Sequence, residues 1–290
     1  MTSRQDWFAG ARPRTLPAAL VPVAVGTAAS ELANGVIWWR AACALVVSLA
    51  LQIGVNYAND YSDGVRGTDD ERVGPMRLVG SGAASPDAVK RAAFTSFLIA
   101  AIAGLMLAAA AGWWLIAVGF ACVGAAWGYT GGKRPYGYMG LGELFVFVFF
   151  GLVATGGTAY VQDESFTTLG AFAGIPVGLL AVGLLTTNNL RDLLKDEAVG
   201  KRTLAVRLGD HATRIFYAGA IAAVFLCLPY MAIVRPWALI AMASVILAIP
   251  PVKTVLGGAA GRDLIPVLGS TARLQLAFGV MLTVGLSLSG

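Results

Sequence analysis

Long apolar runs separated by short polar segments extend over the whole chain. A helix that crosses a lipid bilayer needs about 20 mostly apolar residues. About nine runs approach that length, at 15–32, 36–58, 91–111, 113–129, 139–160, 167–188, 212–233, 236–256 and 271–289. The polar segments between them are too short for a separate soluble domain. The pattern predicts an all-α fold, a polytopic integral membrane helical bundle of about nine transmembrane helices, in one domain spanning residues 1–290.

The distribution of basic residues predicts the orientation of this bundle. If the N-terminus is cytoplasmic, every Lys and Arg except Arg40 and Arg235 falls in a cytoplasmic segment, as the positive-inside rule requires. The same distribution accounts for the net charge of +5 without a nucleic-acid partner. We therefore expect a multi-pass protein of the cytoplasmic (inner) membrane that contacts membrane lipid and binds no nucleic acid. The sequence identifies no protein partner.

Two acidic segments stand out in a chain with few charges. Charged residues make up 13% of the sequence, against about 25% in soluble domains, and carboxylates at the edge of a membrane are functional candidates because they are costly there. The segments are 59–63 (Asn-Asp-Tyr-Ser-Asp) and 188–196 (Asn-Asn-Leu-Arg-Asp-Leu-Leu-Lys-Asp). They follow the second and sixth apolar runs. The four crossings between them return the chain to the same face, so both should face the cytoplasm.

Each acidic segment has the spacing of a column of oxygen atoms on one face of a helix. The two columns are Asn56, Asp60 and Asp63, and Asn188, Asp192 and Asp196. Oxygen ligands without His or Cys suit Mg²⁺, which proteins commonly bind through one or two carboxylates together with substrate phosphates. We therefore expect the two columns to face each other and to hold a polyphosphate through Mg²⁺.

Basic side chains lie close to both acidic segments. Arg and Lys are the usual partners of phosphate groups, so a site for a diphosphate and Mg²⁺ would use both kinds of charge. The nearby basic residues are Arg66, Arg72 and Arg77 after the first segment, Lys133 and Arg134 between the fourth and fifth runs, and Arg191, Lys195, Lys201 and Arg202 around the second segment.

Three other interpretations share some of these features. Charged helix ends can simply solvate loops, but this does not explain why Asn and Asp recur at helical spacing on two helices that reach one face. A secondary cation transporter would place its carboxylates near the bilayer midplane, whereas these lie at helix ends. A CDP-alcohol phosphotransferase requires the motif D-G-x-x-A-R, which residues 63–66 (Asp-Gly-Val-Arg) do not satisfy.

Three motifs resemble the UbiA superfamily of intramembrane prenyltransferases: N-D-x-x-D at 59–63, Y-x-x-x-K-R at 129–134 and N-x-x-x-D-x-x-x-D at 188–196. The resemblance covers nearly the whole chain. It implies transfer of an allylic polyprenyl group from a polyprenyl diphosphate to an aromatic or other acceptor, with Mg²⁺ held by the two Asp-rich motifs. In one departure from the family pattern, Gly67 replaces a third acidic residue of the first motif, and Asp69 is the nearest substitute.

Further segments are similar to one branch of this superfamily, which uses 1,4-dihydroxy-2-naphthoate as the acceptor. These segments are 12–17, 74–82, 142–151 and 200–209. The similarity implies loss of CO₂ and diphosphate and formation of demethylmenaquinone, a step of menaquinone biosynthesis. The alternative acceptors within the superfamily are 4-hydroxybenzoate and homogentisate.

The resemblance and the charges together assign an expected role to each candidate residue. The expected metal ligands are Asp60, Asp63, Asp192 and Asp196, with Asp69 as a fifth candidate. The first four are also the expected catalytic residues, together with Lys133, which would neutralise the departing diphosphate. Glu143 is expected to orient a basic group or the acceptor hydroxyl, and Arg14 to hold the acceptor carboxylate. The remaining expected substrate-binding residues are Asn56, Asn59, Arg77, Tyr129, Arg134, Asn188, Arg191, Lys201 and Arg202.

Overall fold

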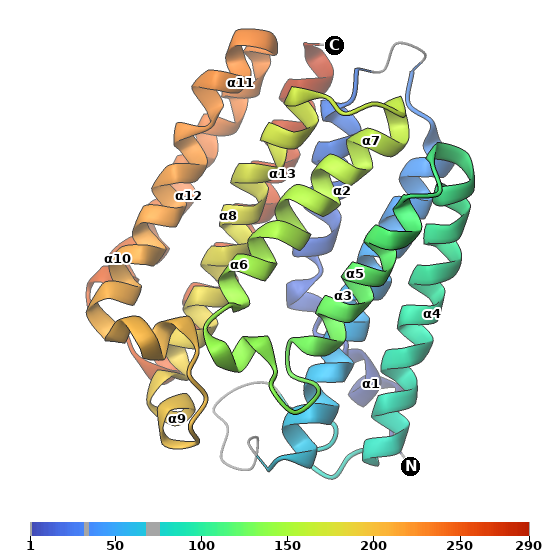
Figure 1. Cartoon of the computed structure of the whole chain (residues 1–290). Coiled ribbons are helices and arrows are strands. Elements are labelled where there is room, and N and C mark those ends of the chain that lie inside the picture. Colours follow the sequence, from blue (N-terminus) through green and yellow to red (C-terminus); the bar gives the residue numbers. More distant parts are fainter. Residues whose placement is uncertain (1, 32–34, 68–75, 290) are drawn as a thin grey trace.

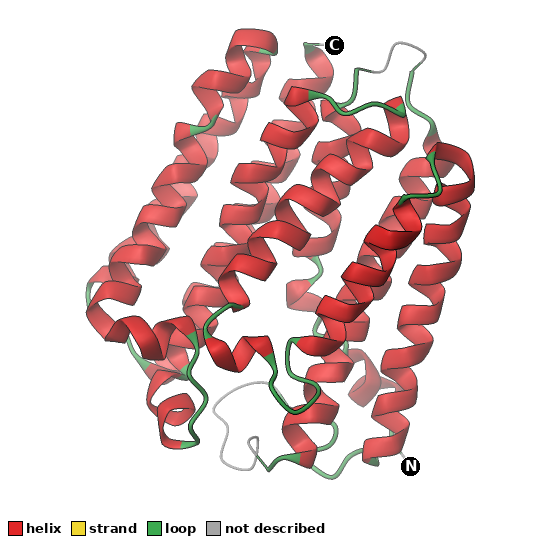
Figure 2. Ribbon diagram, viewed as in Figure 1, coloured by secondary structure: helices red, strands yellow, loops and turns green. Residues whose placement is uncertain are grey.

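A computed structural model describes residues 2–31, 35–67 and 76–289. The elements in chain order are α1 (Arg4–Gly10), η1 (Pro13–Thr15), α2 (Pro17–Ala29), α3 (Trp38–Val65), α4 (Pro86–Ala111), α5 (Leu115–Gly128), η2 (Tyr136–Met139), α6 (Gly142–Val146), η3 (Phe147–Gly156), α7 (Gly157–Asp163), α8 (Thr168–Arg191), α9 (Leu193–Ala198), α10 (Leu204–Leu226), α11 (Leu228–Val234), η4 (Pro236–Ser244), α12 (Val245–Leu256), η5 (Gly261–Leu264) and α13 (Ile265–Leu288). All regular secondary structure in the described ranges is helical (Figure 2), which confirms the predicted all-α class. The long helices form one bundle, with α1 and α9 at one end and the C-terminus at the other (Figure 1).

Seven helical segments of the described chain are long and apolar enough to cross a membrane: Trp38–Val65, Pro86–Ala111, Gly142–Asp163, Thr168–Arg191, Leu204–Val234, Pro236–Leu256 and Gly261–Leu288. The other two predicted runs, 15–32 and 113–129, form the shorter apolar helices α2 and α5, of 13 and 14 residues. At 1.5 Å per residue, each of these two is about 20 Å long. Every predicted run therefore contains a helix, but only seven have the length of a full crossing.

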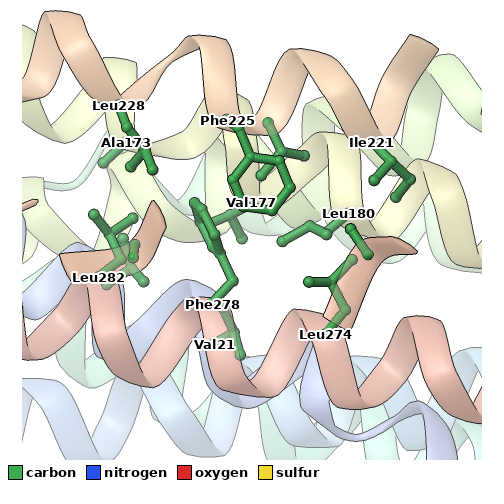
Figure 3. Close-up of a cluster of buried hydrophobic side chains, with 14 of the residues drawn as sticks. Val21, Ala173, Val177, Leu180, Ile221, Phe225, Leu228, Leu274, Phe278 and Leu282 are labelled. Atoms are coloured by element: carbon green, nitrogen blue, oxygen red, sulfur yellow. The ribbon is translucent and has the colours of Figure 1, made fainter. Parts of the chain in front are cut away.

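One half of the bundle is built around α8. Apolar side chains of α2, α8, α10 and α13 interdigitate there (Figure 3). Val177 and Leu180 of α8 are fully buried in this cluster. The rings of Phe225 on α10 and Phe278 on α13 meet edge to face, with centroids 6.0 Å apart. Close packing of this kind makes the half rigid, so the end of α8, where the second acidic segment begins, is held in place.

The π-helix η3 lies directly against α8 because glycines line the contact. A Cβ atom added to Gly151 would lie 2.6 Å from the carbonyl oxygen of Gly174 and 2.7 Å from the Cα of Gly178. Small residues allow membrane helices to approach this closely. The contact fixes the aromatic side chains of η3 relative to α8, and both elements contribute to the cavity that contains the candidate site.

Candidate active site

A cavity of about 1260 Å³ opens within the bundle and brings the two acidic segments together. It is bounded by residues of α3, α4, α5, η3, α8 and α9 and by the N-terminal segment around η1. Eleven of the residues that the sequence nominates line it: Arg14, Asn56, Asn59, Asp63, Arg77, Tyr129, Asn188, Arg191, Asp192, Asp196 and Lys201. Both acidic segments therefore face one space, at the end of the bundle that carries α1 and α9 (Figure 1).

The first acidic segment is helical, as its spacing predicts, because α3 continues to Val65. The side-chain amide of Asn56 donates to the carbonyl oxygen of Ala11 at 2.9 Å, which ties the N-terminal segment to α3. The side-chain oxygen of Asn59 accepts a hydrogen bond from the hydroxyl of Thr130 at 2.7 Å. Asp63 extends the same helix face and lines the cavity.

Asp60 makes a different contact from its neighbours in the motif. Its two carboxylate oxygens accept the backbone N–H groups of Leu78 and Val79, at 2.8 and 3.0 Å. The side chain is 1% exposed and is not part of the cavity wall. These bonds hold the segment that carries Arg77, a buried guanidinium on the cavity wall. Metal binding by Asp60 thus stays a prediction, while its contact with this loop is present in the structure.

The spacing of the second acidic segment predicts one continuous helix, and this prediction is wrong: the helix is interrupted at Asp192. The helix α8 ends at Arg191, Asp192 lies between helices with φ −95° and ψ 6°, and α9 begins at Leu193. Arg191 donates two hydrogen bonds to Asp192, one of them from Nε to Oδ1 at 2.8 Å. Beyond α9, the Nζ of Lys201 lies 3.6 Å from Oδ1 of Asp196. Each carboxylate of this segment is therefore already beside a basic residue.

Tyr138, which the sequence analysis did not nominate, lies between Asp63 of the first acidic segment and Lys201, the basic neighbour of Asp196. Its hydroxyl donates to Oδ1 of Asp63 at 2.7 Å. The Nζ of Lys201 lies 5.1 Å from the centre of its ring, and the guanidinium carbon of Arg66 lies 5.4 Å from it. Cations at such distances from an aromatic ring are attracted to its face. No spacing rule in the sequence marks Tyr138, because its partners come from segments far apart in the chain.

The loop after α5 does not bring its basic side chains to the cavity. Lys133 and Arg134 are exposed and lie outside the cavity wall. The same holds for Arg202, which lies between α9 and α10. Arg66 instead holds this loop, by donating to the carbonyl oxygens of Thr130 and Gly132. Contacts of Lys133, Arg134 and Arg202 with a substrate therefore stay predictions. Asp69, the fifth candidate ligand, falls outside the described residues.

Glu143 and Asn189 form a buried hydrogen-bonded pair at the cavity wall. Glu143, near the start of α6, accepts a hydrogen bond from the side-chain amide of Asn189 at 2.9 Å. Asn189 lines the cavity, whereas Glu143 does not. In the structure Glu143 therefore orients a neutral amide and not a basic group.

Away from these charged groups the cavity is apolar. Phe145 stacks on Tyr136 with ring centroids 3.9 Å apart, and Phe145, Phe149 and Phe150 line the wall. Residues of α4 and α5 continue the apolar surface: Leu98, Ala101, Gly104, Leu105, Gly119, Phe120 and Val123. The cavity therefore has a charged end and an apolar extension, a combination suited to a molecule with an anionic head and a hydrocarbon tail.

The donor atoms at the charged end fit Mg²⁺ by their chemistry. The candidate ligands Asp63, Asp192 and Asp196 offer carboxylate oxygens, whereas Cys122 lines the cavity among the apolar residues of α5. Within the described ranges, no three acidic, His or Cys side chains lie close enough together to hold a metal ion by themselves. Such an arrangement agrees with the usual behaviour of Mg²⁺, which takes only one or two carboxylates and completes its shell with water and substrate phosphate oxygens.

Solved structures of low sequence identity have the same fold. A UbiA homolog from Aeropyrum pernix K1 superposes with a TM-score of 0.75 at 16% identity, covering 94% of this chain and 98% of that one. A UbiA homolog from Archaeoglobus fulgidus bound to DMAPP and Mg²⁺ superposes with a TM-score of 0.61 at 14% identity, covering 96% and 99%.

Curated proteins of much higher identity cover almost the whole chain. The 1,4-dihydroxy-2-naphthoate octaprenyltransferase of Mycobacterium tuberculosis is 49% identical over 280 residues, which are 97% of this chain and 96% of that protein. The protein of the same name from Escherichia coli is 38% identical over 238 residues, 77% of this chain and 75% of that one. The UbiA prenyltransferase family model matches residues 19–264, which include both acidic segments and the loop between α5 and α6. With its apolar helices, its two acidic segments on one cavity and these relatives, the chain belongs to the UbiA prenyltransferase family.

Proposed function

We propose that this protein transfers a polyprenyl chain from a polyprenyl diphosphate to 1,4-dihydroxy-2-naphthoate, with release of diphosphate and CO₂, to give demethylmenaquinol, the reduced form of demethylmenaquinone. The observation that carries the proposal is the cavity, whose charged end contains residues of both acidic segments and whose other walls are apolar. The relatives named as 1,4-dihydroxy-2-naphthoate octaprenyltransferases, 38 to 49% identical, support the choice of acceptor.

The donor fits the cavity in both its parts. Arg77, Arg191 and Lys201 line the charged end and can donate to the oxygens of a diphosphate. The polyprenyl tail would lie along α4, α5 and η3, where each buried methylene contributes about 0.8 kcal/mol. Tail and head would therefore be recognised by different sets of residues, and the allylic carbon would lie where the two sets meet.

Asp63, Asp192 and Asp196 are the residues that would hold Mg²⁺ against the diphosphate. Bound there, Mg²⁺ would supply Lewis-acid stabilisation of the negative charge on the departing group. The protein contributes the remaining stabilisation through the fixed positive charges of Arg77, Arg191 and Lys201. Asn188, Asn189 and Tyr129 also line the cavity and can orient the reactants by hydrogen bonding.

The proposed reaction replaces the carboxylate of the acceptor by the prenyl group. The C–O bond between the allylic carbon and the diphosphate breaks, and its electron pair leaves with the diphosphate. The ring carbon that carries the carboxylate forms the new C–C bond to the prenyl group. The bond from this carbon to the carboxylate then breaks, so that CO₂ leaves and its electron pair restores the aromatic ring. The apolar walls along α4, α5 and η3 offer few polar groups that would hold water near the allylic cation.

The topology of the chain bears on which membrane holds the protein and on which side of it the site lies. We propose a single-domain protein of the cytoplasmic membrane, with the N-terminus and the site on the cytoplasmic side. The supporting observations are the seven apolar helices, the positive-inside distribution of Lys and Arg, and the position of α1 and α9 at one end of the bundle (Figure 1).

An acceptor panel tests the proposal. Purified protein is incubated with a polyprenyl diphosphate and, separately, 1,4-dihydroxy-2-naphthoate, 4-hydroxybenzoate or homogentisate, and products are identified by mass spectrometry. We expect demethylmenaquinol, which air oxidises to demethylmenaquinone during extraction, and we expect it only when Mg²⁺ is present. Product from 4-hydroxybenzoate or homogentisate alone would keep the prenyl transfer and replace the acceptor. No product from any acceptor would contradict the proposal, and cation flux in liposomes would then be measured.

A further inference from the structure

Lys195 occupies an unusual place in the cavity wall. It lies on α9 between Asp192 and Asp196, and it lines the cavity with them. Its Nζ is buried and has no hydrogen-bond partner in the part of the chain that the structure describes. A buried ammonium group without a partner is strongly disfavoured. Such a group is expected to have a partner in the functional state of the protein.

The neighbouring basic residues differ from Lys195 in this respect. Arg191 donates to Asp192, and the Nζ of Lys201 lies 3.6 Å from Asp196. Both carboxylates that flank Lys195 in sequence thus already have basic partners from other positions. Lys133, the lysine that the family motif nominates, is exposed and outside the cavity. Among the described lysines, Lys195 and Lys201 line the cavity, and Lys195 is the one without a carboxylate contact.

We propose that Lys195 is a substrate-binding residue whose ammonium group pairs with an anionic oxygen of a bound substrate. The inference rests on the proposed function, because that reaction supplies two such anions to this cavity: the diphosphate of the donor and the carboxylate of the acceptor. Both offer the same chemistry to Lys195, a negatively charged oxygen that accepts a charge-assisted hydrogen bond.

The proposal explains why a lysine is tolerated here without a partner in the protein. When a substrate enters, its anion replaces the missing hydrogen-bond acceptor, and the cost of the buried charge becomes part of the binding energy. If Lys195 had a structural role, removing its charge would lower the stability of the substrate-free protein. If Lys195 binds a substrate instead, that stability should not fall. Replacing a buried, unpaired ammonium by an uncharged side chain of similar length should leave the substrate-free protein at least as stable.

The test compares three variants of the full-length protein in detergent. Lys195→Met removes the charge and keeps most of the length, whereas Lys195→Arg keeps the charge. Lys253→Met is the matched control, because Lys253 is exposed on α12 and does not line the cavity. For each protein we would measure the thermal midpoint without substrate, the shift of that midpoint produced by pyrophosphate with Mg²⁺ and by 1,4-dihydroxy-2-naphthoate, and KM for both substrates.

We expect Lys195→Met to keep the thermal midpoint of the wild type without substrate and to raise KM for one substrate about tenfold or more, as loss of a hydrogen bond to a charged group implies. A rise for the polyprenyl diphosphate would identify the diphosphate as the partner, and a rise for the acceptor would identify the carboxylate. Lys195→Arg should recover part of the loss, and Lys253→Met should match the wild type.

Unchanged KM values for both substrates in Lys195→Met would overturn the inference, and so would a lower midpoint of the substrate-free variant with no preferential loss of either substrate. Failure of the proposed function has a different signature, since the wild type itself would then form no product. In that case the ligand-induced shifts decide: a shift that the wild type shows and Lys195→Met loses supports the role of Lys195, and equal shifts in both proteins overturn it.

Discussion

The hydroxyl of Tyr138 donates a hydrogen bond to Oδ1 of Asp63 at 2.7 Å, across 75 positions of sequence. This bond joins η2 to the first acidic segment. The ring of Tyr138 also lies 5.1 Å from the Nζ of Lys201, and that Nζ lies 3.6 Å from Asp196 of the second acidic segment. The relative position of the two segments therefore depends in part on one aromatic residue that holds neither a metal nor a substrate in our proposal.

Tyr138→Phe tests this dependence. The substitution removes the hydrogen bond to Asp63 and keeps the ring beside Lys201. A hydrogen bond to a charged group contributes about 1.5–3 kcal/mol, so we expect kcat/KM to fall about tenfold or more. Varying Mg²⁺ should reveal a higher concentration for half-maximal rate, because the orientation of Asp63 is less restricted. An unchanged Mg²⁺ dependence together with wild-type kcat/KM would show that Asp63 does not need this bond.

Asp192→Asn tests the proposed metal-binding role of the second segment. The substitution keeps the size of the side chain but removes the negative charge that Mg²⁺ requires. We expect turnover to fall by about a thousandfold or more, together with a lower thermal midpoint, because the substitution also removes the charge partner of the buried Arg191 guanidinium. The matched control is Asp87→Asn, because Asp87 is an exposed residue in the first turn of α4, outside the cavity. Substantial turnover by Asp192→Asn would remove Asp192 from the metal site.

Asp60→Asn should behave differently, because Asp60 accepts two backbone N–H groups of the Arg77 segment. An amide has only one acceptor oxygen, so one N–H group would meet an NH₂ group and lose its partner. We expect a loss of about 2 kcal/mol in stability, seen as a lower thermal midpoint, together with weaker binding of pyrophosphate through displacement of Arg77. A loss of turnover without any loss of stability would instead favour direct metal binding by Asp60.

Gly119→Leu tests the apolar part of the cavity. Gly119 lines the wall, and nothing lies within 4 Å of a Cβ atom added there. A leucine should therefore fit without strain and project into the space for the tail. We expect KM to rise for a long polyprenyl diphosphate and to change little for geranyl diphosphate, with stability kept or raised by about 1 kcal/mol because leucine favours helix more than glycine.

Gly219→Leu is the control for this experiment. Gly219 on α10 also has open space around an added Cβ atom, but it does not line the cavity. The Gly219→Leu variant should gain the same stability from helix propensity. Its preference for the chain length of the donor should not change. An equal effect of both substitutions on long donors would argue against a tail along α5.

The sequence by itself determined the class of the fold and the meeting of the two acidic segments at one end of the bundle. The apolar runs are long enough to require membrane helices, because a backbone in lipid must satisfy its own hydrogen bonds, and each of the nine runs contains a helix. An even number of crossings then places both acidic segments at one end, and both border one cavity. Helical spacing also identified the faces of Asn56 and Asp63 correctly.

Only the tertiary structure decided which atoms meet. Spacing places Asp60 and Asp63 on one face of α3, yet Asp60 binds a returning loop and Asp63 binds Tyr138, because the partner of a helical side chain depends on the path of another segment. The break at Asp192, the exposure of Lys133 and the burial of the Nζ of Lys195 have the same origin. Periodicity is a local property, whereas hydrogen-bond partners and burial result from segments far apart in the chain that pack together.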